Sequence, residues 1–231
     1  MENIWGFEFA KVSSVAELQD IYTLRYKVYV DEWGFEHPDD HPEGIETDAF
    51  DKYSVHFMAS RYGQLLGTIR LILHSPEGFP IEKHCTITAD CSAIGPERIA
   101  EISRLAISKE YRKRAVDRLL YSASPGEGQD VSQEDVPNSR RKRQEIIIGL
   151  FKAMYAESKR LGLTHWYAVM AKALHVLLQR IGFDFVPIGP DVEYHGLRAP
   201  YILCIEDVEK RLSMNNPELY KEFVEAAGCG V

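Results

Sequence analysis

Ile99-Ala100-Glu101-Ile102-Ser103-Arg104-Leu105-Ala106-Ile107-Ser108 alternates in polarity, yet apolar side chains dominate both of its faces. This pattern is typical of a strand at the centre of a sheet, which is covered on both sides. Glu101 and Arg104 interrupt it. Because they are three residues apart, they point to opposite faces of a regular strand, and only a β-bulge brings them to one side. We therefore expect a central strand at residues 99–108, whose chemistry depends on a bulge that the sequence cannot show.

Upstream of this strand, the sequence predicts a helix and a hairpin. Ser14-Val15-Ala16-Glu17 has the form of a capping box, and an apolar stripe at helical spacing follows it. Arg25 lies within that stripe and must meet a carboxylate, a carbonyl group or a ligand, since an unpaired buried guanidinium is costly. Two alternating runs, Ser54 to Arg61 and Gln64 to Leu73, are separated by Tyr62-Gly63 and read as paired strands.

Downstream, helices and strands alternate after a polar segment at Ser122 to Asn138, which carries prolines and glycines and which we expect to be mobile. The mixed order of elements predicts an α/β (α+β) protein, a sheet with helices on both faces. We expect one domain over residues 1–231, with an insertion at about 122–143 and a helical extension at about 207–227. The expected later elements are a helix at Gln144 to Leu161, a strand at Thr164 to Met170, a helix at Lys172 to Arg180, strands at Phe183 to Ile188 and Tyr201 to Ile205, and a helix within Asp207 to Ala227.

The composition excludes several classes of protein. The formal net charge of −8 argues against general nucleic-acid binding, which depends on a basic surface. No apolar run approaches the roughly 18 residues of a membrane span, and we expect no signal peptide and no stable membrane insertion. The four cysteines lack paired C-x-x-C spacing, so we expect neither a zinc site, nor any other metal site, nor a disulfide framework. These features together favour a cytoplasmic protein.

Three clusters of polar and aromatic residues are the strongest functional signal. They are Leu24-Arg25-Tyr26-Lys27-Val28-Tyr29-Val30-Asp31-Glu32-Trp33, then Glu46-Thr47-Asp48-Ala49-Phe50-Asp51 with Gly67-Thr68-Ile69-Arg70-Leu71, and finally Glu101-Ile102-Ser103-Arg104-Leu105-Ala106.

In content and order these clusters resemble the acyl-homoserine-lactone (autoinducer) synthases and the N-acyl amino acid synthases, in particular the bacterial PEP-CTERM/exosortase-associated acyltransferases. The resemblance is clear over about residues 14–108. It implies the GNAT fold, with a mixed, mostly antiparallel central sheet, and a bulge in the central strand. It also implies transfer of an acyl group from a thioester to an amine. The residues at the matching positions are Arg25, Tyr29, Trp33, Glu46, Asp48, Asp51, Arg70, Glu101 and Arg104; Tyr29 stands where the lactone synthases usually have Phe.

The nature of the acyl donor follows from a motif that is missing. Residues 112–143 lack the R-x-x-G-x-G/A turn by which acetyl-coenzyme-A-dependent GNAT enzymes hold pyrophosphate at a helix N-terminus. An acyl-carrier protein presents only phosphopantetheine, so we expect it to be the donor and partner, with acyl-CoA less favoured and no tightly bound cofactor. Basic runs near this segment are either solvated faces or a docking patch for the acidic carrier; the candidate docking residues are Arg112, Arg114, Arg140, Arg141 and Arg143.

Aminolysis of a thioester needs a deprotonated amine and a site for the oxyanion. Glu46, Asp48 and Glu101 are candidates to hold the ammonium group and accept its proton, and a bulged strand could aim backbone N–H groups from Ile102 to Leu105 at the carbonyl oxygen. We assign Glu46, Asp48, Glu101 and Arg104 as catalytic, and Arg25, Tyr29, Trp33, Asp51, Arg70 and Ser103 as substrate-binding.

A structural interpretation competes with this assignment. Arg25, Asp48, Asp51, Arg70 and Arg104 could form a charge network that holds the N-terminal helix to the sheet, because buried charges are paired. Both interpretations could hold together. Tyr29 and Trp33 are better explained as packing residues than as direct catalysts.

The favoured function is transfer of a long-chain acyl group from acyl-carrier protein to the amine of an amino acid or a related small amine. The alternatives are an acyl-homoserine-lactone synthase that uses S-adenosylmethionine, and a non-catalytic acyl-carrier or lipid-binding module. We expect the acyl chain in an apolar tunnel with walls in Gln144 to Tyr155 and Trp166 to Leu178.

Overall fold

The computed structural model describes residues 6–111 and 136–228, which form an eight-stranded mixed sheet covered by helices. The strand order is β1-β2-β3-β4-β5-β8-β6, and β7 pairs with β8. All neighbours are antiparallel except β4 and β5, which are parallel. The strands are β1 (Glu8–Lys11), β2 (Ser54–Arg61), β3 (Gln64–Leu73), β4 (Ile99–Ile107), β5 (His165–Met170), β6 (Val186–Pro187), β7 (Val192–Glu193) and β8 (Leu197–Cys204).

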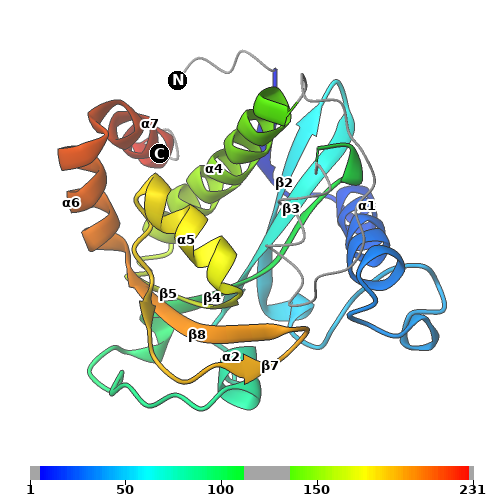
Figure 1. The fold of residues 1–231 in the computed structure, drawn as a ribbon, viewed down its shortest axis with the longest axis horizontal. Coiled ribbons are helices and arrows are strands. Elements are labelled where there is room, and N and C mark those ends of the chain that lie inside the picture. Colours follow the sequence, from blue (N-terminus) through cyan, green and yellow to red (C-terminus); the bar gives the residue numbers. More distant parts are fainter. Residues whose placement is uncertain (1–5, 112–135, 229–231) are drawn as a thin grey trace.

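Helices cover both faces of this sheet. Helix α4 packs on β1 and β2, whereas α1 packs on β3 and β4 from the other side, and Figure 1 shows the two helices flanking the β2–β3 hairpin. The C-terminal helix α7 lies against α4. The described helices are α1 (Val15–Tyr26), continued by a π-helical segment η1 (Lys27–Glu32), α2 (Pro80–His84), α4 (Val136–Arg160), α5 (Lys172–Ile181), α6 (Ile205–Asn215) and α7 (Pro217–Gly228).

Most of the expected elements are confirmed, because their sequence patterns are local. The hairpin strands β2 and β3 and the capping box at Ser14 occur as expected. The main errors lie in the later half. Helix α4 begins at Val136, so the predicted insertion at 122–143 is wrong for its last part, while residues 122–135 lie outside the described range. Where the sequence predicts a helix within Asp207 to Ala227, the structure has two helices, since α6 ends at Asn215 and α7 begins at Pro217.

The central strand β4 carries the predicted bulge. Its register against β3 passes from Thr68–Ala106 to Arg70–Ser103, so β4 has one residue more than β3 in this interval. The side chains change face accordingly. Ala100 and Ile102 pack in the core under α4, and beyond the bulge it is Ile107 that packs there, whereas Ala106 packs against α1. The bulge therefore reverses which face odd-numbered residues occupy.

Within the described part of the chain, no helix combines the length and the apolar character that crossing a membrane requires.

Candidate active site

A cluster of arginines and carboxylates joins α1, the loop before β2, β3 and β4. The buried guanidinium of Arg25 donates from Nε to Glu46 and from Nη1 to Asp51 at 2.7 Å. Arg70 donates to both oxygens of Asp48, at 2.7 and 2.8 Å, and to Asp51 at 2.7 Å. Arg104 donates to Glu46 at 2.9 Å. The predicted network is thus present, and it ties helix α1 to two strands of the sheet.

Within this cluster, Glu46 and Asp48 are already bound. Glu46 is 1% exposed, and both of its oxygens accept from guanidinium groups of Arg25 and Arg104. Burial by itself raises the pKa of Glu46, but the charges of Arg104 and Arg25 outweigh it and hold the pKa below its ordinary value. The pKa of Asp48 is likewise lowered, since its hydrogen bonds and charge pairing with Arg70 outweigh burial. Neither carboxylate is suited to accept a proton near neutral pH.

Glu101 has a different environment. It is 3% exposed, and its Oε2 accepts a hydrogen bond from the backbone N–H of Ile81 at the start of α2, at 2.9 Å. Burial raises the pKa of Glu101 to about 8, which the Ile81 hydrogen bond and the charge of Arg70 only partly offset. A carboxyl group whose pKa lies near the working pH is suited to general base catalysis.

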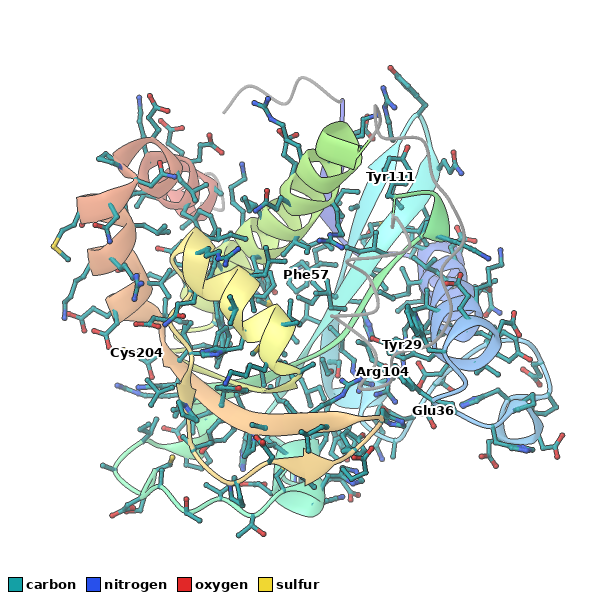
Figure 2. All side chains as sticks on the ribbon, viewed as in Figure 1. Tyr29, Glu36, Phe57, Arg104, Tyr111 and Cys204 are labelled. Atoms are coloured by element: carbon teal, nitrogen blue, oxygen red, sulfur yellow. The ribbon has the colours of Figure 1, made fainter. Side chains whose placement is uncertain are left out.

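The bulge organises the side chains next to Glu101. Arg104 has a φ of 51°, a strained backbone conformation for an arginine that commonly marks functional sites. The Ser103 hydroxyl accepts a hydrogen bond from Arg70 Nε at 2.9 Å, and the Tyr29 hydroxyl donates to the Leu105 carbonyl at 3.0 Å. Figure 2 shows Tyr29 and Arg104 close together, with Glu36 beside them.

A polar pocket of about 420 Å³ opens over this cluster. The bulge brings Glu101 and Arg104 to the same pocket, as the sequence analysis required. The β7–β8 turn and the loop after η1 complete the wall. The lining residues are Tyr29, Glu36, His41, Glu46, Thr47, Asp48, Ala49, Phe50, Arg70, Pro80, His84, Glu101, Ile102, Ser103, Arg104, Val169, Tyr194, His195 and Arg198.

A second, mainly apolar cavity of about 70 Å³ lies where β4 and β5 separate. The two strands pair only from Ile99–His165 to Ile102–Ala168, and β5 then continues along β8. Its walls include Phe151 and the segment from Ala168 to Leu178, which both fall within the expected tunnel walls. The residues that line both cavities are Tyr29, Ile102, Ser103, Arg104, Val169 and Arg198.

Of the predicted substrate-binding residues, Arg25, Trp33 and Asp51 line neither cavity. Trp33 has a packing role. The Trp33 side chain is half-buried, stacks on Phe35 with ring centroids 6.2 Å apart, and packs against the core. Tyr29 both packs and lines the two cavities. The other predicted residues, Arg25, Asp51, Arg70 and Ser103, belong to the charge cluster or are hydrogen-bonded to it.

The predicted docking residues are only partly described. Arg143 is 3% exposed, so the expectation that it docks a partner is wrong: it lies on the inner side of α4. Arg141 is exposed. Arg112 and Arg114 lie outside the described residues, as does the side chain of Arg140.

The residues of the polar pocket that sequence reasoning missed include Glu36, Tyr194, His195 and Arg198. Tyr194 and His195 lie in the β7–β8 turn and Arg198 lies at the start of β8, none of which a sequence pattern predicted, and Glu36 lies in a loop rich in acidic residues. Of these residues, only Glu36 could have been suspected from its position, because it follows Trp33, the end of the first cluster, by three residues.

No group of His, Cys, Asp or Glu that could hold a metal ion occurs among residues 6–111 and 136–228.

Comparison with known proteins supports the fold. Residues 24–122 match a family model described as an acetyltransferase (GNAT) domain. TofI, solved with an inhibitor and MTA, is 17% identical with a TM-score of 0.60, covering 92% of this chain and 98% of TofI. BjaI, a CoA-dependent acyl-homoserine lactone synthase solved with SAM and isopentyl-CoA, is 18% identical with a TM-score of 0.57, covering 97% of this chain and 100% of BjaI.

A third solved structure is FeeM, an N-acyl amino acid synthase from uncultured soil microbes. It is 12% identical with a TM-score of 0.54, covering 89% of this chain and 94% of FeeM. The protein therefore has the GNAT fold, with an open, mostly antiparallel sheet and helices on both faces, as the sequence analysis expected.

Proposed function

We propose that this protein is an N-acyltransferase that moves an acyl group from a phosphopantetheine thioester to the amine of an amino acid or a related small amine. The observation that carries the proposal is the junction of two cavities at the β4 bulge. One cavity is apolar and suits an acyl chain, and the other is polar and contains a carboxyl group with a raised pKa.

In this proposal, Glu101 is the group that accepts a proton from the acceptor ammonium. It is the carboxyl group of the pocket that no arginine hydrogen-bonds among the described residues, and burial brings its pKa to about 8. The free amine then attacks the thioester carbonyl carbon, the C–S bond breaks, and the thiolate leaves with a proton that the nitrogen loses. Glu46, Asp48 and Arg104 hold the pocket in shape and set its charge.

The same geometry supports a position for the acyl carbonyl at the bulge. The acyl chain enters between β4 and β5, where the parallel pairing stops after Ile102–Ala168. A bulge turns backbone groups out of the regular ladder, so N–H groups from Ile102 to Leu105 can stabilise the negative charge that develops on the carbonyl oxygen. The role of Arg104 is to fix this bulge, since three carboxylates hold its side chain.

An acyl-carrier protein is our proposed donor, on the ground of the missing pyrophosphate turn. BjaI, a CoA-dependent acyl-homoserine lactone synthase, has a similar fold, so the donor has to be tested directly. We keep the basic residues Arg112, Arg114, Arg140 and Arg141 as the proposed carrier contact.

The experiment is a transfer assay on the purified protein. Acyl-carrier-protein and CoA thioesters of C8 to C16 acids are each incubated with the L-amino acids, and products are detected by mass spectrometry. We expect an N-acyl amino acid, formed faster from the carrier-protein thioester. No N-acyl product from either donor with any amine contradicts the proposal.

A lactone synthase is the second candidate, because the solved structure of BjaI contains SAM and its fold covers almost the whole chain. Adding S-adenosylmethionine to the same assay decides between them: an acyl-homoserine lactone formed only in its presence favours this second function.

A further inference from the structure

Glu36 is a carboxylate of the polar pocket that differs from its neighbours in how it is held. Its side chain is 25% exposed, and it contacts Arg104 Nη2 through Oε1 at 3.3 Å. Glu46 and Asp48, in contrast, accept two or more shorter hydrogen bonds from arginines. Glu36 and Arg104 lie side by side in Figure 2.

The charges of the cluster do not balance. Three arginines, Arg25, Arg70 and Arg104, contact four carboxylates, which are Glu36, Glu46, Asp48 and Asp51. The cluster thus carries one negative charge in excess when all seven groups are ionised. Glu46, Asp48 and Asp51 each contact two arginines, whereas Glu36 contacts only Arg104 among the three, at 3.3 Å. The excess charge is therefore available to a cation at Glu36.

The neighbour of Glu36 on the opposite wall does not supply that cation. His195 Nε2 lies 3.6 Å from Glu36 Oε1, which is too far for a hydrogen bond. Burial, followed by the charges of Arg198 and Arg104, lowers the pKa of His195 to about 4, so His195 is neutral near pH 7. The His195 ring packs on Phe35 with centroids 5.3 Å apart and thereby keeps the loop of Glu36 against the β7–β8 turn.

We propose that Glu36 binds the acceptor in its ammonium form and so selects amines over neutral nucleophiles, while Glu101 takes the proton. This inference rests on the proposed function. It divides two tasks between two carboxyl groups of one pocket: Glu36 recognises the charge that most amines carry in water, and Glu101 removes it. Glu36 is thus a specificity-determining residue, and Glu46 and Asp48, which the sequence analysis assigned to this task, are occupied by arginines.

The test compares Glu36→Gln with the control Glu43→Gln, which changes an exposed carboxylate of the same loop. Glutamine keeps an oxygen that can accept from Arg104, so the fold is expected to persist, and thermal unfolding checks this. With the best amino acid and a saturating thioester, we expect the KM for the amine to rise about 10- to 100-fold in Glu36→Gln, as for loss of one hydrogen bond between charged groups. We expect kcat to stay within about threefold, and Glu43→Gln to match the wild type.

A second readout separates recognition from a structural effect. The 2-hydroxy acid analogue of the same amino acid lacks the ammonium group, and its inhibition constant is expected to be equal in wild type and Glu36→Gln. An unchanged KM for the amine, or an inhibition constant that rises as much as KM does, overturns the role of Glu36 alone. Absence of any N-acyl product from the wild type overturns the proposed function itself, and the role of Glu36 with it.

Discussion

At the scale of single residues, the account depends on how differently one pocket treats its carboxyl groups. Glu46 and Asp48 are fixed as anions by guanidinium groups, whereas burial raises the pKa of Glu101 to about 8. Residues of one chemical type are thus given different tasks by their surroundings.

Replacing Glu101 by Gln preserves the acceptor for the Ile81 N–H but removes the proton acceptor. We expect kcat for transfer to fall about 100- to 10,000-fold, measured with saturating donor and amine. A loss below about threefold would exclude Glu101 as the base.

The pH dependence of transfer tests the same residue. The base must be ionised, and burial places the pKa of Glu101 at about 8. We expect kcat/KM to rise with pH through a limb near pH 8 in the wild type, and this limb to be missing from the residual rate of Glu101→Gln. Identical profiles for the two proteins would contradict the assignment.

The transfer rate is expected to rise with pH, whereas the stability of the folded protein is expected to fall. The pKa of Glu101 rises from an ordinary 4.5 to about 8 on folding, so the native state binds the proton more tightly than the unfolded chain. The native state then holds more protons between about pH 4.5 and 8, and stability falls as pH increases over this range. We expect Glu101→Gln to raise the Tm relative to wild type at pH 8 and to change it less at pH 4.5. An equal shift at both pH values would mean that Glu101 is not buried as an acid.

At the scale of elements, the charge cluster fastens helix α1 to the sheet. Arg25 is completely buried between Glu46 and Asp51, so removing it leaves Glu46 with Arg104 alone and Asp51 with Arg70 alone as guanidinium partners, and opens a cavity under the helix. We expect Arg25→Ala to lower the free energy of unfolding by about 3–5 kcal/mol, measured by urea denaturation at pH 7. Lys27→Ala, at an exposed position just beyond the helix, is the control and should change it by less than about 0.5 kcal/mol. A small effect of Arg25→Ala would show that the cluster serves the pocket and not the attachment of the helix.

The elements also show what the sequence can and cannot predict. Strands β2 and β3 and the start of α1 depend on local alternation and on capping, and they were predicted to within a residue. The bulge depends on how β4 pairs with β3, which no local pattern encodes, although the spacing of Glu101 and Arg104 showed that one was needed. The pairing of Arg25 followed from its place in an apolar stripe. Its partners, and the saturation of Glu46, depend on contacts between distant segments. Glu36 and His195 could not be predicted for the same reason, because they line one wall of the polar pocket from loops that are far apart in the chain.

At the scale of the whole molecule, the sheet brings the proposed acyl site and the proposed amine site together at the β4 bulge. Parallel pairing of β4 with β5 stops at Ile102, and the apolar cavity lies beyond this point, next to the polar pocket.

Leu174 of α5 lines the apolar cavity. We expect Leu174→Trp to fill this cavity, so that a long acyl chain can bury fewer methylene groups, each of which contributes about 0.8 kcal/mol. The preferred acyl chain should therefore become shorter. Competition between C8 and C16 thioesters measures the shift. An unchanged preference would place the acyl chain elsewhere.

The most direct test of the account is a crystal structure of the protein with a 2-oxoalkyl thioether of phosphopantetheine, which keeps the carbonyl group but cannot transfer it. The account predicts the carbonyl oxygen within about 2.7–3.2 Å of a backbone N–H group at the β4 bulge. It also predicts the alkyl chain between β4 and β5, against Phe151 and Leu174. An alkyl chain bound in another cavity, or a carbonyl group that lies away from the bulge and from Glu101, would contradict it.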